Sequence, residues 1–169
     1  MTETLISSTD VRLLSRDISA HLRDERIMPL IREAEDMYIR PTIGDDLYMQ
    51  MVADISLHPV LRNGGSYESE CGEKRYCSGL ARASAYYTYA KIVLNNQTNI
   101  TAWGAVQKNI PESTPMMDSS INKTYNDAKA MADRYMSECI DYISAVIYPT
   151  RCCGSSHTSS KTIITAIGE

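Results

Sequence analysis

The chain has 169 residues, 43% of them apolar and 22% charged, which predicts one globular domain with a core of its own. Its net charge of −4, without a concentrated basic patch, argues against a nonspecific nucleic-acid binder, because such proteins displace counterions with clustered Lys and Arg. A mildly acidic protein is still suited to line a channel through which DNA passes, since repulsion prevents sticking. The 11 Tyr, one Trp and no Phe fit either a Tyr-rich partner surface or a Tyr-rich core.

Cysteine usage and hydropathy indicate a protein kept in a reducing cytoplasm. Residues 1–20 lack the basic start and apolar block of a secretion signal, and the odd count of 5 Cys argues against a disulfide framework. The most apolar stretch, residues 79–94, contains Arg82 and Lys91 and is too short to span a bilayer. A zinc site would need Cys71, Cys77, Cys152, Cys153 and His157, which lack the usual gap of about two to four residues inside a ligand pair.

The N-terminal part of the chain predicts two helices. A short one covers about residues 9–15, because Ser and Asp side chains at its start supply caps, whereas residues 17–23 fit no element clearly. The second begins between residues 24 and 28, with Pro29 in its first turn, and stops at Arg40 before Pro41. Its apolar stripe comprises Ile27, Leu30, Ile31, Ala34 and Tyr38, and its opposite face Arg32, Glu33, Glu35 and Asp36.

A third helix is predicted after Gly44. Two carboxylates, Asp45 and Asp46, lie in its first turn and suit the positive end of the helix dipole. The pair His58–Pro59 ends this helix, and the polar residues 62–73 then predict an exposed loop. The expected buried face comprises Leu47, Tyr48, Met51, Val52 and Ile55.

A fourth helix is predicted over residues 74–95, followed by an extended segment. Small residues on this helix would permit close approach of a neighbouring helix. Residues 100–110 are apolar with a central glycine, which predicts a short strand or hairpin, the only β element expected in the main body. The apolar positions of the fourth helix are Leu80, Ala83, Tyr87, Ala90 and Leu94.

The strongest helical signal lies between the capping residues 118–120 and Pro149. Its apolar positions repeat at heptad spacing, and a helix of this extent would form a rod of about 45 Å. The rod fits the core of a helical bundle, or else an intermolecular coiled coil. The seam comprises Ile121, Tyr125, Ala128, Ala132, Tyr135, Cys139, Tyr142 and Val146, and it is widened by Met131, Met136, Ile140, Ile143 and Ile147.

The tail, residues 150–169, breaks this pattern. Residues 151–160 are rich in Ser and Cys and predict a flexible stretch, whereas residues 162–167 form a β-type apolar run. A lone strand is unstable in water, so this run is either disordered or added to a sheet edge in another chain. Addition to a sheet edge fits better, because an exposed run of this kind aggregates. The candidate partner interface comprises Thr162, Ile163, Ile164, Thr165, Ala166 and Ile167 in the tail, and Tyr67, Trp103, Val106 and Lys108 in loops.

No constellation of residues predicts catalysis. The three His residues have no spacing typical of a metal site or of a base beside a nucleophile. The pair Asp45–Asp46 indicates helix capping, and Gly64–Gly65 indicates a turn, since no Lys-Ser/Thr pair follows it. We therefore expect no enzyme, no cofactor and no metal site. Six Arg residues near the N-terminus interleave with acidic residues and predict a solvated or partner-facing surface: Arg12, Arg16, Arg23, Arg26, Arg32 and Arg40.

The order of short motifs carries a resemblance over about residues 5–148. The segment 28–35 (MPLIREAE) is followed by 40–44 (RPTIG) and 46–48 (DLY), and 103–109 (WGAVQKN) precedes the long last helix. In this order the chain resembles short head–tail adaptor proteins of tailed bacteriophages, particularly those of Bacteroidales phages, including the crAss-like group. The tail after Pro149 departs from the pattern.

The resemblance implies a mainly α fold: a helical bundle of about four to five helices over residues 1–149, with a long C-terminal helix and a short hairpin, then an extended tail over residues 150–169. Such adaptors assemble, usually as twelve copies, into a ring that joins the portal to the tail and continues the DNA channel. The implied partners are other copies, the portal protein and downstream tail proteins, with DNA only as passing cargo and no membrane contact. The implied location is the neck of a virion assembled in the host cytoplasm. A cytoplasmic helical protein-binding or regulatory module is the alternative.

Overall fold

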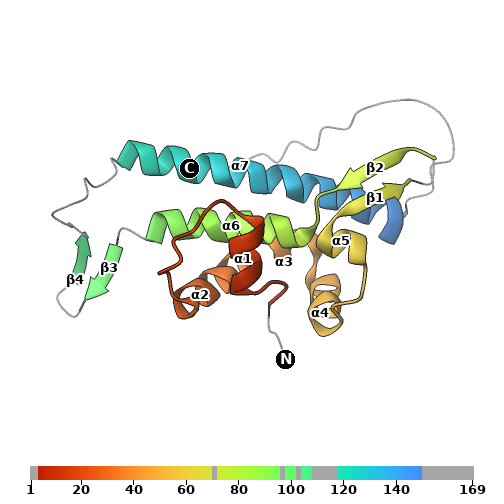
Figure 1. The fold of residues 1–169 in the computed structure, drawn as a ribbon. Helices are drawn as coiled ribbons and strands as arrows, with labels where there is room; N and C mark the ends of the chain where they lie inside the picture. Colours follow the sequence, from red (N-terminus) through yellow and green to blue (C-terminus); the bar gives the residue numbers. More distant parts are fainter. Residues whose placement is uncertain (1–3, 70–71, 96–97, 102–103, 108–117, 150–169) are drawn as a thin grey trace, which may run out of the picture.

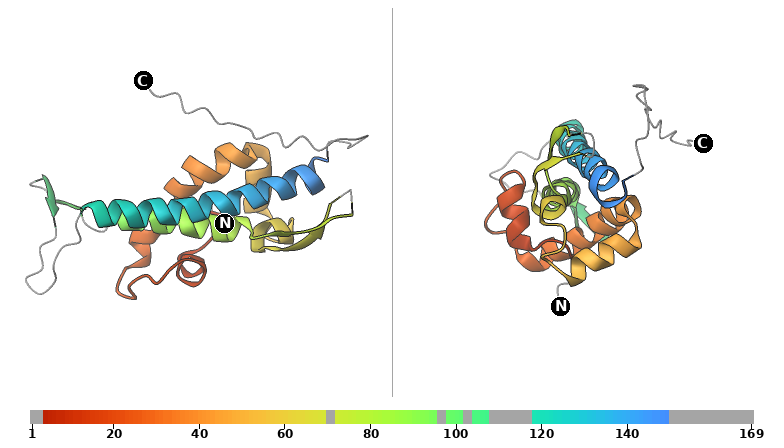
Figure 2. Two further views of the ribbon diagram at one scale, coloured as in Figure 1. Left: turned by 90° about the horizontal axis from the view of Figure 1, so that it is seen from above. Right: turned by 90° about the vertical axis from the view of Figure 1, so that its right-hand side faces the viewer.

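Helix α6 (Leu80–Asn95) lies at the centre of the fold because small and apolar residues occupy most of its circumference. The computed structural model describes residues 4–69, 72–95, 98–101, 104–107 and 118–149, and it confirms a mainly helical fold. The end-on view of Figure 2 shows the N-terminal helices wrapped around α6, with the last helix on the remaining side. The buried α6 side chains are Leu80, Ala81, Ala83, Ser84, Ala85, Tyr87, Thr88, Ala90 and Ile92, whereas Leu94 is 38% exposed.

The long helix α7 (Asp118–Tyr142) runs antiparallel to α6 (Figure 1). Its heptad seam is an internal contact, because Ala128, Ala132 and Cys139 are fully buried and α6 is its main neighbour. Alanine on both helices removes the bulk that would otherwise hold their axes apart. The seam ends early: the π-helical turn η2 (Ile143–Ile147) changes the helical register, and Val146 is 41% exposed.

The short helix α1 (Ser8–Leu14) begins within one residue of the predicted start. The Ser7 side chain caps it by accepting from the Asp10 backbone N–H at 3.2 Å, and the Asp10 carboxylate accepts from the Ser7 N–H at 2.8 Å. This reciprocal pair satisfies backbone donors that the first turn leaves open. Both α1 and α2 (Asp24–Ala34) pack on α6. Pro29 lies in the second turn of α2 rather than in the first, contrary to the prediction.

The prediction that the second helix stops at Arg40 is wrong. The helix continues through a π-helical turn, η1 (Glu35–Ile39), into α3 (Arg40–Ile43). In that turn the Arg40 N–H donates to the Glu35 carbonyl, one residue further back than in an α-helix. Pro41 therefore lies in the first turn of the new segment, where its missing N–H costs least.

The same π-turn changes which residues face the core. It adds one residue to the turn, so the inward positions step by four along the whole helix. Glu35, predicted on the solvated face, is thereby turned inward and is 0% exposed. The buried column is Ile27, Ile31, Glu35, Ile39 and Ile43.

Helix α4 (Asp45–Ala53) buries Leu47, Tyr48 and Met51 as predicted. Ile55 lies beyond its end and is 60% exposed, so the expectation that this residue is buried is wrong. The pair His58–Pro59 does not close α4, since Pro59 begins a further short helix, α5 (Pro59–Asn63).

A hairpin replaces the loop predicted over residues 62–73 and the predicted start of the fourth helix. Strand β1 (Gly65–Glu68) pairs antiparallel with β2 (Lys74–Cys77), with Gly65 opposite Cys77. The strands are short and mostly polar, so they show no alternation of apolar residues that a sequence pattern could detect. The hairpin is held by α7, on which the Tyr67 ring packs edge-on against Tyr142 with centroids 4.9 Å apart.

The hairpin expected between the two long helices is confirmed. Strand β3 (Thr98–Thr101) pairs antiparallel with β4 (Gly104–Gln107). The two hairpins lie at opposite ends of the α6–α7 pair (Figure 1).

Most tyrosine side chains lie in the interior of the fold or at its edge. Only Tyr76 and Tyr148 are exposed, at 60% and 59%, and the other Tyr side chains are buried or half-buried. Tyr38 stacks on Tyr87 with ring centroids 4.3 Å apart, which joins η1 to α6. The Tyr-rich core is therefore the better of the two readings of the composition.

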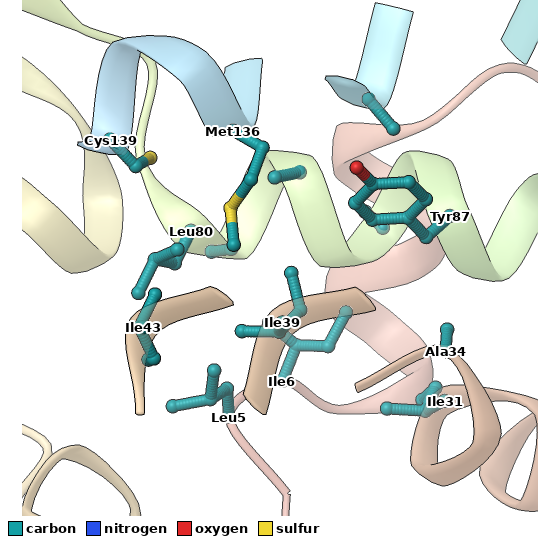
Figure 3. Packing of buried hydrophobic residues seen from close by; sticks show 14 of the residues in the cluster. Leu5, Ile6, Ile31, Ala34, Ile39, Ile43, Leu80, Tyr87, Met136 and Cys139 are labelled. Atoms are coloured by element: carbon teal, nitrogen blue, oxygen red, sulfur yellow. The ribbon is translucent and has the colours of Figure 1, made fainter. Parts of the chain in front are cut away.

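The core also includes the start of the chain. Figure 3 shows Leu5 and Ile6 beside Ile39 and Ile43, under Leu80 of α6. No helix in the described part of the chain combines the length and the apolar character needed to cross a membrane.

Candidate protein-binding surface

The buried Glu35 carboxylate fixes the N-terminal segment. Its oxygens accept from the Leu5 backbone N–H at 3.0 and 3.1 Å, from the Tyr48 hydroxyl at 2.8 Å and from the Ser84 hydroxyl at 3.1 Å. These donors come from the N-terminal segment, α4 and α6, so one side chain joins three parts of the fold. Because protein donors surround it, this carboxylate acts as a structural anchor rather than a ligand site.

Burial raises the pKa of Glu35 above its ordinary value of 4.5, although the hydrogen bonds from Leu5, Tyr48 and Ser84 oppose the shift. Between the ordinary and the raised pKa, the folded state binds more protons than the unfolded state, so the contribution of Glu35 to stability falls as pH rises through this window. We expect the free energy of unfolding of the wild type, minus that of Glu35→Gln, to decrease as pH rises from 4.5. Urea unfolding at several pH values measures it, and parallel profiles would contradict the raised pKa.

The Glu35 anchor positions one wall of an apolar groove. This α1–α6 groove is a hollow of about 430 Å³ between the N-terminal segment, α1, the end of α4, α5 and α6. Two of its side chains are far more exposed than apolar residues usually are: Leu13 at 75% and Ile55 at 60%. The apolar lining comprises Leu5, Ile6, Leu13, Leu14, Ile55 and Ala81.

Two Arg side chains line the α1–α6 groove without a carboxylate partner among the described residues. Arg62 donates to the backbone carbonyls of Met51, at 2.9 Å, and of Leu5. Arg82 is exposed, with its guanidinium 5.8 Å from the centre of the Tyr135 ring. The one acidic lining residue, Asp10, is already engaged by Ser7. The groove therefore combines an apolar lining with a local excess of positive charge.

A second exposed apolar surface lies near the C-terminal end of α7. Ile140 is 43% exposed, Val146 is 41% exposed and Tyr148 is 59% exposed. Val146 and Tyr148 follow the last buried residue of α7, Tyr142, whereas Ile140 lies on the outer face of the helix between the buried Cys139 and Tyr142. We call this set the α7-end surface.

The Arg residues near the N-terminus form no free basic patch. Arg12 pairs with Asp24 at 3.0 Å, Arg40 pairs with Asp45 at 2.5 Å, and Arg16 pairs with Asp127 of α7. Arg32 also has a partner. These pairs agree with a solvated surface and leave little positive charge for phosphates.

The predicted interface residues are spread over the chain. Tyr67 lies in β1, half-buried against Tyr142, so part of its ring is already used within the chain. Val106 lies in β4. Trp103, Lys108 and the tail run 162–167 lie outside the described residues. The structure therefore does not bring the predicted set together in one place.

Cys77 and Cys139 meet in the core, with their sulfur atoms 3.7 Å apart. Both are free thiols and fully buried, and the hydrogen bond between the two thiols, together with burial, raises the pKa of Cys139. Within the described ranges no three His, Cys, Asp or Glu side chains converge as metal ligands would. Of the conceivable zinc set, Cys77 lies within the described ranges, whereas Cys71, Cys152, Cys153 and His157 lie outside them.

Comparison with known proteins places the chain in a family. The model of a family of unknown function, DUF6712, matches residues 39–159. The chain belongs to this family. No curated protein matches it, and no solved structure does.

The family match divides the α1–α6 groove. It covers α6 and α7 but starts at residue 39, after α1 and α2. Leu13 therefore lies outside the matched range, whereas Ile55, Arg62 and Arg82 lie inside it.

Proposed function

We propose that the chain is a structural virion protein of a tailed phage: an adaptor that forms an oligomeric ring between the portal vertex and the tail and continues the DNA channel. The proposal starts from the resemblance of residues 5–148 to head–tail adaptors, and it assigns no catalytic step to the chain. Its copies assemble in the host cytoplasm and are retained in the neck of the particle.

The observation that carries the proposal is the presence of two different sets of exposed apolar side chains on separate elements of one fold. The α1–α6 groove exposes Leu13 and Ile55, and the α7-end surface exposes Ile140, Val146 and Tyr148. A ring is built from heterologous contacts, in which one surface of a subunit meets a different surface of the next. Two unlike surfaces on separate elements supply what this arrangement needs.

The charge of the protein suits a channel. Net charge is −4, and three of the six Arg residues near the N-terminus, Arg12, Arg16 and Arg40, are paired with carboxylates. A wall of this kind repels the phosphate backbone and lets DNA pass without binding.

The alternative, a cytoplasmic regulatory module acting through an intermolecular coiled coil, finds less support. Its binding surface would be the α7 seam, and Ala128, Ala132 and Cys139 of that seam are fully buried within the chain. Exposing them would require separation of α7 from α6.

The proposal is tested by co-assembly. We expect the purified chain to be monomeric or weakly associated, and to form rings on the portal protein of the same phage, as seen by native mass spectrometry and electron microscopy. Val146→Asp, on the α7-end surface, should reduce ring formation, whereas Ser144→Asp, on an exposed position of the same turn, should not. Absence of the protein from mature particles would overturn the proposal.

A further inference from the structure

We propose that in the free protomer the α1–α6 groove is covered by the tail of the same chain, with residues 162–167 as the occupant. The groove leaves two large apolar side chains open to solvent: Leu13 is 75% exposed and Ile55 is 60% exposed. The inference concerns the isolated protomer, so it does not depend on whether the protein forms a ring.

The chemistry of the tail matches that of the groove. In an extended segment alternate side chains share one face, so Ile163 and Ile167 point to the same side. Two branched apolar side chains fit a hollow of about 430 Å³, and burying each removes apolar surface from water on both partners. Glu169, two residues after Ile167, supplies a negative charge for a groove whose Arg62 and Arg82 lack carboxylate partners among the described residues.

The geometry places the groove within reach of the tail. Tyr142, near the end of α7, touches Tyr67 of β1, and β1 directly follows α5, which carries Arg62. Residues 150–161 span up to about 40 Å when extended. Figure 1 shows the end of α7 on the same side of the molecule as α5.

The same chain is favoured over a second copy as the source of the tail. A short linker holds its segment at an effective concentration of about a millimolar near the groove, well above the concentration of other copies in dilute solution. Such a contact shields apolar surface until a partner displaces the tail, which would limit the aggregation that an exposed β-type run favours.

Photo-crosslinking of the full chain tests the inference. A benzophenone amino acid at position 13, where Leu13 is exposed, is expected to form an adduct with the peptide that contains residues 162–167. The experiment uses a mixture of ¹⁴N- and ¹⁵N-labelled chains at low concentration. Adducts that join two peptides carrying the same isotope support the same-chain contact. Adducts that join a ¹⁴N peptide to a ¹⁵N peptide show contact with a second copy and overturn the inference, as do adducts that lack the tail peptide.

Variants separate the apolar and the charged parts of the contact. Ile163→Asp with Ile167→Asp should lower the adduct yield at least about tenfold, whereas Ser159→Asp with Ser160→Asp, which adds the same charge in the linker, should leave it unchanged. Arg82→Glu should lower the yield about twofold to fivefold, and adding Glu169→Lys should restore it. Equal yields in the two Asp pairs would contradict docking of the apolar run.

Discussion

Replacement of Glu35 by alanine is expected to destabilise the fold by about 3 kcal/mol or more, because each buried donor left without an acceptor costs about 1–3 kcal/mol. The donors are the Leu5 N–H and the hydroxyls of Tyr48 and Ser84, all of which lie in buried residues. The removal of a buried charge offsets part of this loss. Chemical denaturation monitored by circular dichroism gives the free energy of unfolding.

The matched control for this variant is Asp36→Ala. Asp36 lies next to Glu35 on the same helix and pairs with Arg40 at 3.7 Å, and the two side chains are 63% and 45% exposed. Loss of such an exposed pair costs about 1 kcal/mol or less. Losses of similar size in the two variants would show that Glu35 is not an anchor. The expected pattern also includes release of the segment around Leu5, seen as faster amide hydrogen exchange at its N–H.

Replacement of Gly79 by alanine is expected to cost about 3 kcal/mol or more, because the new methyl group has no room. An added Cβ would lie 2.4 Å from the backbone nitrogen of Gly64 and 2.8 Å from the carbonyl oxygen of Arg62. Both contacts are with backbone, so no side chain can move aside. Gly79 also has φ +90°, where an L-residue costs about 1–2 kcal/mol. The contact holds the base of the β1–β2 hairpin against the start of α6.

Gly44→Ala separates these two causes. Gly44 also has a positive φ, +86°, but nothing lies within 4 Å of an added Cβ. Its variant should therefore show only the conformational cost, about 1–3 kcal/mol for this glycine-only region of the backbone. Thermal and urea unfolding of both variants measure the difference, and equal losses would mean that the backbones at Gly79 and Gly64 are not in close contact.

Sequence patterns do not predict the α1–α6 groove. Ile55 fits the apolar stripe of a predicted helix, which indicates burial, yet it is 60% exposed, and Leu13 is 75% exposed. Whether an apolar side chain on a helix is covered depends on which element packs over it. Likewise, Arg62 and Arg82 are 20 positions apart in the sequence, and only the placement of α5 beside α6 brings them to one surface.

The sequence alone determined the helical class, most helix positions and the hairpin between the two long helices, because the spacing of apolar residues and the caps act over a few neighbouring positions. Tertiary structure decided the rest. The π-turn at Glu35–Ile39 adds one residue that no local preference indicates, and hydrogen bonds from Leu5, Tyr48 and Ser84 offset part of the cost of burying the Glu35 carboxylate. The β1–β2 hairpin is likewise stabilised by α7 and by the contact between Gly64 and Gly79, not by its own polar strands. Contacts between residues distant in the sequence supply those energies, so they become visible only once the chain is folded.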